Sequence, residues 1–217
     1  MTTYNLFDDA DDAPWTETLA PGAVVLRRFA AADASALLTA IHQLTGQAPL
    51  RHMLTPNGFQ MSVTMSNCGD VGWVSDRHGY RYDAVDPASG QPWPALPPLF
   101  LTLAAGAAAA AGYADFVPDA CLINCYLPGT KMSLHQDRDE RDTSQPIVSV
   151  SLGIPATFQF GGARRTDPSV KVALTHGDVV VWGGPTRLNF HGVLPLKPAS
   201  HAATGERRFN LTFRKAR

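Results

Sequence analysis

The stretch Ser133 to Glu140, SLHQDRDE, places metal-ligating side chain types close together in the sequence. Four of its eight residues are charged, and such a run is by itself typical of a solvated surface loop. On a β-strand, however, side chains alternate between two faces, so His135 and Asp137 point the same way and Asp139 follows them if the strand continues. The first two can converge on one ion, and Asp139 offers a third oxygen ligand or a charge beside the metal. The pattern predicts a metal centre that needs one further protein ligand.

Two later histidines are candidates for this ligand. His176 in THGDVVVW and His191 in NFHGV each stand beside a glycine at the boundary of a β-like run. Spacing alone does not separate them, and either could be an ordinary turn histidine. Two histidines and one carboxylate leave half of an octahedron open, which is the ligand set of non-haem Fe(II) oxygenases. A zinc hydrolase can use the same ligand types.

The last β-like run, RRFNLTFRKAR, alternates polar and apolar side chains. Arg208, Asn210, Thr212 and Arg214 fall on one face, and phenylalanine and leucine fall on the other. If the apolar face packs against a helix, the two arginines face the interior, where an unpaired charge is rarely tolerated. Because arginine binds carboxylates in a bidentate manner, we expect the pair, about 20 Å apart along the strand, to bracket a small dicarboxylate. The alternative is an edge strand with solvated arginines.

Hydrophobic periodicity indicates the elements that position these residues. The segment from about Asp33 to Leu44 predicts a helix with Asp33 as its cap, and a second helix is expected from Pro97 to near Gly112. Between them, TPNGFQMSVTMSNCG has the alternation of a half-buried strand. After Pro118, seven short β-like runs follow without a helix: ACLINCYL, IVSVSLG, ATFQFGG, VKVAL, DVVVWGG, LNFHGVLPL and RFNLTFR.

This succession predicts an α+β fold whose core is an antiparallel jelly roll, or double-stranded β-helix. We expect one domain over 1–217, with the core at about 118–217 and two helices packed outside one sheet. An aromatic-rich segment at about 50–94 would lie over the open end. Residues 1 to about 20 are acidic and aperiodic, which indicates a surface arm or a partly disordered one.

Composition excludes several classes of protein. A net charge of -1 gives no broad positive surface for a phosphate backbone, so a nucleic acid would need a local patch or a pocket. Three cysteines argue against a secreted disulfide scaffold. The acidic start is not a signal peptide, and no apolar stretch is long enough to cross a bilayer. We expect a soluble, cytoplasmic monomer with no membrane partner.

Taken together, these stretches resemble the AlkB family, the iron- and 2-oxoglutarate-dependent dioxygenases that repair alkylated nucleic-acid bases, and the bacterial members in particular. The resemblance extends over nearly the whole chain and includes MSVTMSNCG, GYRYDAVDP, PWPALP, PDACLINCYLPGTKMSLHQDRDE, PIVSVSLGIPATFQFGG, HGDVVVWGG, HGVLPLK and RFNLTFR. It implies that the iron ligands are His135, Asp137 and His191, with His176 in a turn.

The resemblance also implies the remaining site residues. The 2-oxoglutarate site would be formed by Asn124, Tyr126, Met132, Arg208, Asn210 and Arg214. The segment at about 50–94 would form the nucleotide-recognition lid, and the substrate-binding residues would be Met65, Trp73, Tyr80, Arg81, Tyr82, Asp139 and Arg165. Cys125 stands where the family leads us to expect an arginine, but alternation turns it away from Asn124 and Tyr126, so the pocket should stay intact.

The activity implied is oxidative demethylation of N-alkylated bases of the 1-methyladenine and 3-methylcytosine type, with Fe(II), 2-oxoglutarate and O2, releasing formaldehyde and succinate. The substrate would be single- or double-stranded DNA, with RNA as a further candidate. Such bases are cationic near neutral pH, so Asp139 would select them over normal bases. The alternatives are the same iron chemistry on RNA modifications, proteins or metabolites, and a metal-free binding module that uses the aromatic lid alone.

Overall fold

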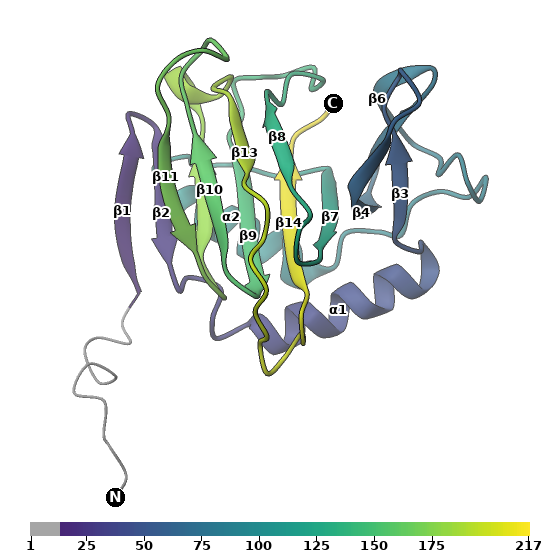
Figure 1. Ribbon diagram of the computed structural model, residues 1–217, viewed down its shortest axis with the longest axis horizontal. Coiled ribbons are helices and arrows are strands. Elements are labelled where there is room, and N and C mark those ends of the chain that lie inside the picture. The colour runs from purple at the N-terminus through teal and green to yellow at the C-terminus, as the bar shows by residue number, and fades with distance from the viewer. Residues whose placement is uncertain (1–13) are drawn as a thin grey trace, which may run out of the picture.

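Two antiparallel β-sheets face each other in the computed structural model, which describes residues 14–217 (Figure 1). The larger sheet has eight strands, in the order β1 (Trp15–Ala20), β2 (Ala23–Arg27), β12 (Val179–Trp182), β9 (Ile147–Gly153), β14 (Arg208–Arg214), β7 (Ala120–Tyr126), β4 (Gln60–Gly69) and β3 (Arg51–Leu54). The smaller sheet has four, in the order β11 (Val170–Leu174), β10 (Ala156–Phe160), β13 (His191–Val193) and β8 (Met132–His135). This arrangement confirms the predicted jelly-roll core.

Strand β14 lies inside the larger sheet, hydrogen-bonded to β7 on one side and β9 on the other. Its apolar residues Phe209, Leu211 and Phe213 belong to the core cluster that contains the helices. Its polar residues are equally buried, but they line a cavity on the opposite face. The predicted division of this strand into a helix-facing face and an interior polar face is therefore confirmed.

Both predicted helices are present. Helix α1 (Ala34–Gln47) buries Leu37, Ile41 and Leu44, as its apolar spacing requires. Helix α2 (Pro98–Ala110) begins directly after Pro97 and ends just before Gly112, whose φ of 89° is one that glycine adopts at little cost. Asp33 precedes α1, but its side chain makes no capping hydrogen bond.

The structure differs from the predicted secondary structure at the start of the chain and in the segment at about 50–94. Trp15–Ala20 form β1, an edge strand paired with β2, where an irregular arm was expected; the remainder of that arm lies outside the described residues, except Pro14. In the 50–94 segment, β5 (Gly72–Asp76) and β6 (Gly79–Asp83) form a separate two-stranded hairpin. A short 3-10 turn (Gly184–Thr186) follows β12.

No helix in residues 14–217 is long and apolar enough to cross a membrane.

Candidate metal centre and cosubstrate pocket

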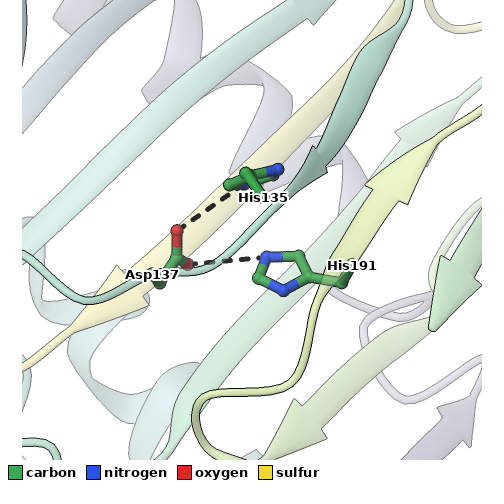
Figure 2. Close-up of side chains that lie close together, drawn as sticks. All are labelled: His135, Asp137 and His191. Carbon is green, nitrogen blue, oxygen red and sulfur yellow. Dashed lines mark ion pairs between the residues drawn. The ribbon is translucent and has the colours of Figure 1, made fainter. Parts of the chain in front are cut away.

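His135, Asp137 and His191 converge on one point between the two sheets (Figure 2). Their candidate ligand atoms all lie within 4.8 Å of one another. Asp137 lies 3.6 Å from His135 Nε2 through Oδ1 and 3.7 Å from His191 Nε2 through Oδ2. The two histidines come together because they are direct partners on the neighbouring antiparallel strands β8 and β13. This is the arrangement of two histidines and one carboxylate that leaves coordination positions open.

Asp137 reaches this point by a different route from the predicted one. Strand β8 ends at His135, so strand alternation does not place Asp137. Instead, Arg214 donates to Asp137 Oδ2 from Nη2 at 2.7 Å and from Nε at 3.0 Å, and Arg187 donates to the main-chain oxygen of Asp137 at 2.7 Å. A loop residue is thus fixed by two buried arginines.

The protonation states of the group suit a metal. Nδ1 of His135 lies 2.9 Å from the Ser133 carbonyl, and Nδ1 of His191 lies 3.0 Å from the Asn189 carbonyl. A proton on each Nδ1 satisfies these carbonyls and leaves Nε2 as the metal-facing lone pair. Burial, together with the neighbouring His135, lowers the pKa of His191 to about 4. Burial alone would raise the pKa of Asp137, but Arg214 and the two histidines hold it below the ordinary value.

The other candidate histidine lies in a different environment. His176 stacks on His201 with ring centroids 4.2 Å apart, and its Nδ1 accepts a hydrogen bond from the Gly153 amide. The cluster of three ligands therefore contains His191 and not His176.

A cavity beside the three candidate metal ligands is lined by every residue predicted to bind the cosubstrate. It is lined by the metal group and by Asn124, Tyr126, Met132, Arg208, Asn210 and Arg214. Cys125 lies on the other face of β7, within the helix-facing core, so the prediction that it leaves the pocket intact agrees with its position.

Arg208 provides the test of whether a dicarboxylate fits this cavity. Its Nε and Nη1 are buried without a hydrogen-bond partner among the described residues, while Nη2 donates to Ser151 Oγ at 3.0 Å. The guanidinium also lies over the Tyr126 ring, 4.9 Å from the centroid. Burial lowers the pKa of Arg208. A buried cation with two free donors matches the carboxylate of a diacid such as 2-oxoglutarate.

Three of the residues predicted to bind substrate contact one another. Trp73 on β5 stacks on Tyr80 on β6, with centroids 5.6 Å apart and ring planes 13° from parallel. Its indole Nε1 donates to Asp139 Oδ2 at 2.8 Å. The group thus joins the β5–β6 hairpin to the loop that carries Asp137.

The other four residues predicted to bind substrate have different surroundings. The Tyr82 hydroxyl donates to the buried carboxylate of Glu140 at 2.6 Å, and Arg81 pairs with Asp76 in its own hairpin. Met65 is fully buried in the core between the sheets. Arg165 is exposed and lies over the Phe190 ring, 5.1 Å from its centroid.

Two further candidate residues, Glu140 and Arg187, were not predicted from the sequence to belong to the site. Both are buried, and they form an ion pair of 3.1 Å beside Asp137. Glu140 is the last residue of SLHQDRDE, but a charged run does not indicate which of its members is buried. Arg187 stands alone between Trp182 and His191 and carries no local signal.

A jelly roll whose interior holds two histidines, a carboxylate and a buried arginine with free donors has the architecture of a non-haem iron oxygenase. Residues 22–214 match the model of the 2OG-Fe(II) oxygenase superfamily. The chain is 61% identical to the Alpha-ketoglutarate-dependent dioxygenase AlkB of Salmonella typhimurium, over 95% of this chain and 96% of that protein. It is 57% identical to the Escherichia coli protein of the same name, over 98% and 97%. The chain belongs to the AlkB family of 2OG-Fe(II) oxygenases.

More distant relatives extend the comparison. The solved structure of OsALKBH1 superimposes with a TM-score of 0.81 at 30% identity, covering 92% of this chain and 99% of that one. An Arabidopsis thaliana protein named DNA N(6)-methyladenine demethylase ALKBH1D is 41% identical, over 45% of this chain and 24% of that protein. The chain is thus a non-haem iron, 2-oxoglutarate-dependent dioxygenase that uses Fe(II), 2-oxoglutarate and O2.

Proposed function

We propose that this enzyme oxidatively demethylates N-alkylated bases of the 1-methyladenine and 3-methylcytosine type in DNA, single- or double-stranded, with RNA as a further candidate substrate. The observation that carries the proposal is the stacked pair Trp73 and Tyr80, hydrogen-bonded through Trp73 to Asp139, two residues from the metal ligand Asp137. Aromatic faces stack on unpaired bases, and a carboxylate beside them favours a cationic one. The demethylase name of the Arabidopsis thaliana relative supports the same substrate class.

The residues of the site have distinct proposed roles. When bound, Fe(II) with 2-oxoglutarate and O2 would supply the oxidation of an N-methyl group: one oxygen atom would go to the methyl carbon, which leaves as formaldehyde, and the other to 2-oxoglutarate, which becomes succinate and CO2. His135, Asp137 and His191 hold the metal, and Arg208 anchors the diacid. Asp139 attracts the positive charge of the methylated ring and orients the base. Because a damaged base is the least costly to extrude from a helix, the enzyme needs no sequence-specific contacts.

We further propose the outline of the substrate site. Residues of about 50–94, which contain the β5–β6 hairpin, form the lid, and Arg165 lies on the opposite wall. Arg81 and Tyr82 support the hairpin, and Met65 packs beneath it. The proposed working form is a cytoplasmic monomer.

Anaerobic reconstitution with Fe(II) and 2-oxoglutarate, followed by exposure to air with a 1-methyladenine oligonucleotide, tests the proposal. Mass spectrometry should show replacement of the methyl group by hydrogen, together with succinate formation. If succinate forms while the oligonucleotide keeps its methyl group, the assignment of a base substrate is wrong and the oxygenase assignment stands.

A charge variant tests the role of the carboxylate. Asp139→Asn should lower kcat/KM for 1-methyladenine by about 10- to 100-fold, the usual strength of a hydrogen bond to a charged group. It should have a smaller effect on an uncharged methylated base such as 1-methylguanine. Asp142→Asn is the matched control, because Asp142 lies on the same loop and its side chain bonds the Ser144 amide. Equal losses on charged and uncharged bases would contradict selection by charge.

A further inference from the structure

The carboxylate of Glu140 is the centre of a buried network next to the metal ligands. Its side chain is only 2% exposed, although its neighbour Asp139 lies at the surface. Glu140 Oε1 accepts from the Tyr82 hydroxyl at 2.6 Å and lies 3.4 Å from Arg214 Nε. Glu140 Oε2 accepts from Arg187 Nη2 at 3.1 Å. This side chain therefore joins the β5–β6 hairpin to two buried arginines.

The same two arginines hold the metal ligand Asp137 at two points. Arg214 binds its carboxylate, with Nη2 at 2.7 Å from Oδ2. Arg187 binds its main-chain oxygen at 2.7 Å and also binds the Gln145 carbonyl, at 2.8 Å. Glu140 thus contacts both groups that fix Asp137.

Asp137 needs such support because no strand holds it. Strand β8 ends at His135, and the next strand, β9, begins only at Ile147. In a loop of this length a carboxylate has many orientations open to it, and ordering its side chain and backbone costs conformational entropy. The hydrogen bonds of a ligand's own partners are what select one orientation in a metal site.

Charge balance gives Glu140 a second role. Arg187 and Arg214 are both buried, and so are the carboxylates of Asp137 and Glu140, so the four charges cancel. Without Glu140, Arg187 would lose the carboxylate with which it forms its ion pair, and Asp137 alone would face Arg214. A carboxylate drawn more strongly to an arginine is a weaker metal ligand, because the metal and the guanidinium compete for the same oxygens.

We propose that Glu140 is a positioning residue of the metal centre: through Arg187 and Arg214 it fixes Asp137 for metal binding, and through Tyr82 it ties the β5–β6 hairpin to that ligand. The inference concerns the metal site and holds whichever substrate the enzyme oxidises. Its failure is therefore separate from failure of the proposed base substrate.

Metal affinity measures the first part directly. The metal-free full chain is titrated with Co(II), with visible absorption reporting affinity and coordination geometry. Glu140→Gln should raise the Co(II) dissociation constant by about tenfold, the lower end of the cost of removing a direct partner of a metal ligand, because Glu140 acts on Asp137 through the two arginines. Asp86→Asn is the matched control, since Asp86 is a carboxylate with a 3% exposed side chain, paired with Arg51 and outside the cavity. The control should stay within about twofold of the parent.

A double variant guards against a simple folding defect. Combining Glu140→Gln with Arg187→Met removes both charges of the pair, so no lone buried charge is left behind. This protein should fold and should still bind Co(II) about 10- to 100-fold more weakly. Co(II) affinity and spectrum like those of the parent, in either Glu140 variant that folds, would overturn the proposal.

Hydrogen exchange tests the link to the hairpin. In the parent protein, Co(II) should slow exchange in β5 and β6 as well as in β8 and β13. In Tyr82→Phe the slowing should persist in β8 and β13 and be weaker in β5 and β6, because the hydroxyl that bonds Glu140 is gone while the Trp73–Asp139 hydrogen bond remains. Slowing of the hairpin as large in Tyr82→Phe as in the parent would refute the coupling through Tyr82.

Discussion

Arg208 and Arg214 stand at the two ends of β14, on the same face of the strand, and only 1% and 6% of their surfaces are exposed. Burial lowers the pKa of Arg208, which has no anionic side chain beside it among residues 14–217. Burial acts in the same direction on Arg214, but Asp137 and Glu140 outweigh it and raise the pKa of that guanidinium. One residue type in one strand thus occurs in two opposite electrostatic states.

The difference indicates what each arginine is for. Arg214 is neutralised within the protein and belongs to the scaffold that fixes Asp137. Arg208 keeps two buried donors without a partner in the described part of the chain, which is costly unless an anion arrives from outside. The proposed anion site therefore lies at the Arg208 end of β14, and the support of Asp137 lies at the Arg214 end.

The largest effect is expected when Arg214 loses its anionic partner and its environment becomes like that of Arg208. Asp137→Ala removes the main anion of Arg214, so metal binding should fall more than 100-fold and the free energy of unfolding of the metal-free protein should drop by about 3 kcal/mol. Co(II) titration and urea unfolding in chelator measure the two effects. Asp142→Asn, which removes the charge of a carboxylate farther along the same loop, is the control for both. An Asp137→Ala protein as stable as that control would contradict the scaffold role of the pair.

The opposite end of the strand should respond in the opposite way. Arg208→Met removes a buried charge without a partner, so the ligand-free protein should be equally stable or about 1 kcal/mol more stable. Its affinity for 2-oxoglutarate in the presence of Co(II) should fall about 100-fold or more, while its affinity for Co(II) stays unchanged. Calorimetric titration separates the two ligands. Destabilisation of the free protein as large as that of Arg214→Met would mean that Arg208 is a structural residue.

The pH dependence of stability tests the electrostatic environment of the candidate metal ligands at the Arg214 end of β14. The pKa of His191 is lowered to about 4 in the folded metal-free protein, against the 6.5 of an unperturbed histidine. The unfolded chain therefore binds a proton between these values that the folded chain does not, so stability is full above about pH 6.5 and is lost as the pH falls towards 4. We expect a loss of roughly 1 kcal/mol per pH unit. Urea unfolding in chelator at pH 7 and pH 5.5 measures it, and His191→Gln should show a shallower slope.

The smallest effect is expected at the Ser151 hydroxyl, which accepts a hydrogen bond from Arg208. Ser151→Ala removes the acceptor of Arg208 Nη2, worth about 1 kcal/mol, so affinity for 2-oxoglutarate should change by less than about tenfold. Calorimetry with Co(II) present should give unchanged metal affinity. A loss as large as that of Arg208→Met would show that the hydroxyl, rather than the guanidinium charge, governs the pocket.

The parts of the fold that were predictable are those in which one strand or helix carries its own periodic signal. The alternation in β14 identified both the interior arginines and the apolar face, and the spacing of Leu37, Ile41 and Leu44 identified α1. The strand β1 and the β5–β6 hairpin were missed, since WTETLA, GWVSD and GYRYD are too short and too poor in aliphatic side chains to give a sustained alternation.

The candidate site was predictable where a short motif sufficed. His135 and Asp137 are two residues apart, whereas the choice of His191 over His176 came only from the resemblance. Glu140 and Arg187 were beyond reach because their contacts join residues 47 positions apart, and nothing local marks either side chain as buried. Asp137 shows the same limit: its place was anticipated, but arginines distant in sequence, rather than a continuing strand, produce it.

The register that makes His135 and His191 direct partners has a consequence for the integrity of the smaller sheet. A metal ion bound by both rings acts as a reversible cross-link between β8 and β13, closing a long loop of chain much as a disulfide does. The stability of this β8–β13 edge then depends on the metal concentration, because a ligand that binds only the native state stabilises it. The metal-free enzyme should therefore be less stable as well as inactive. We expect proteolysis of the metal-free protein to begin in β8 and β13, on the sheet that faces β14.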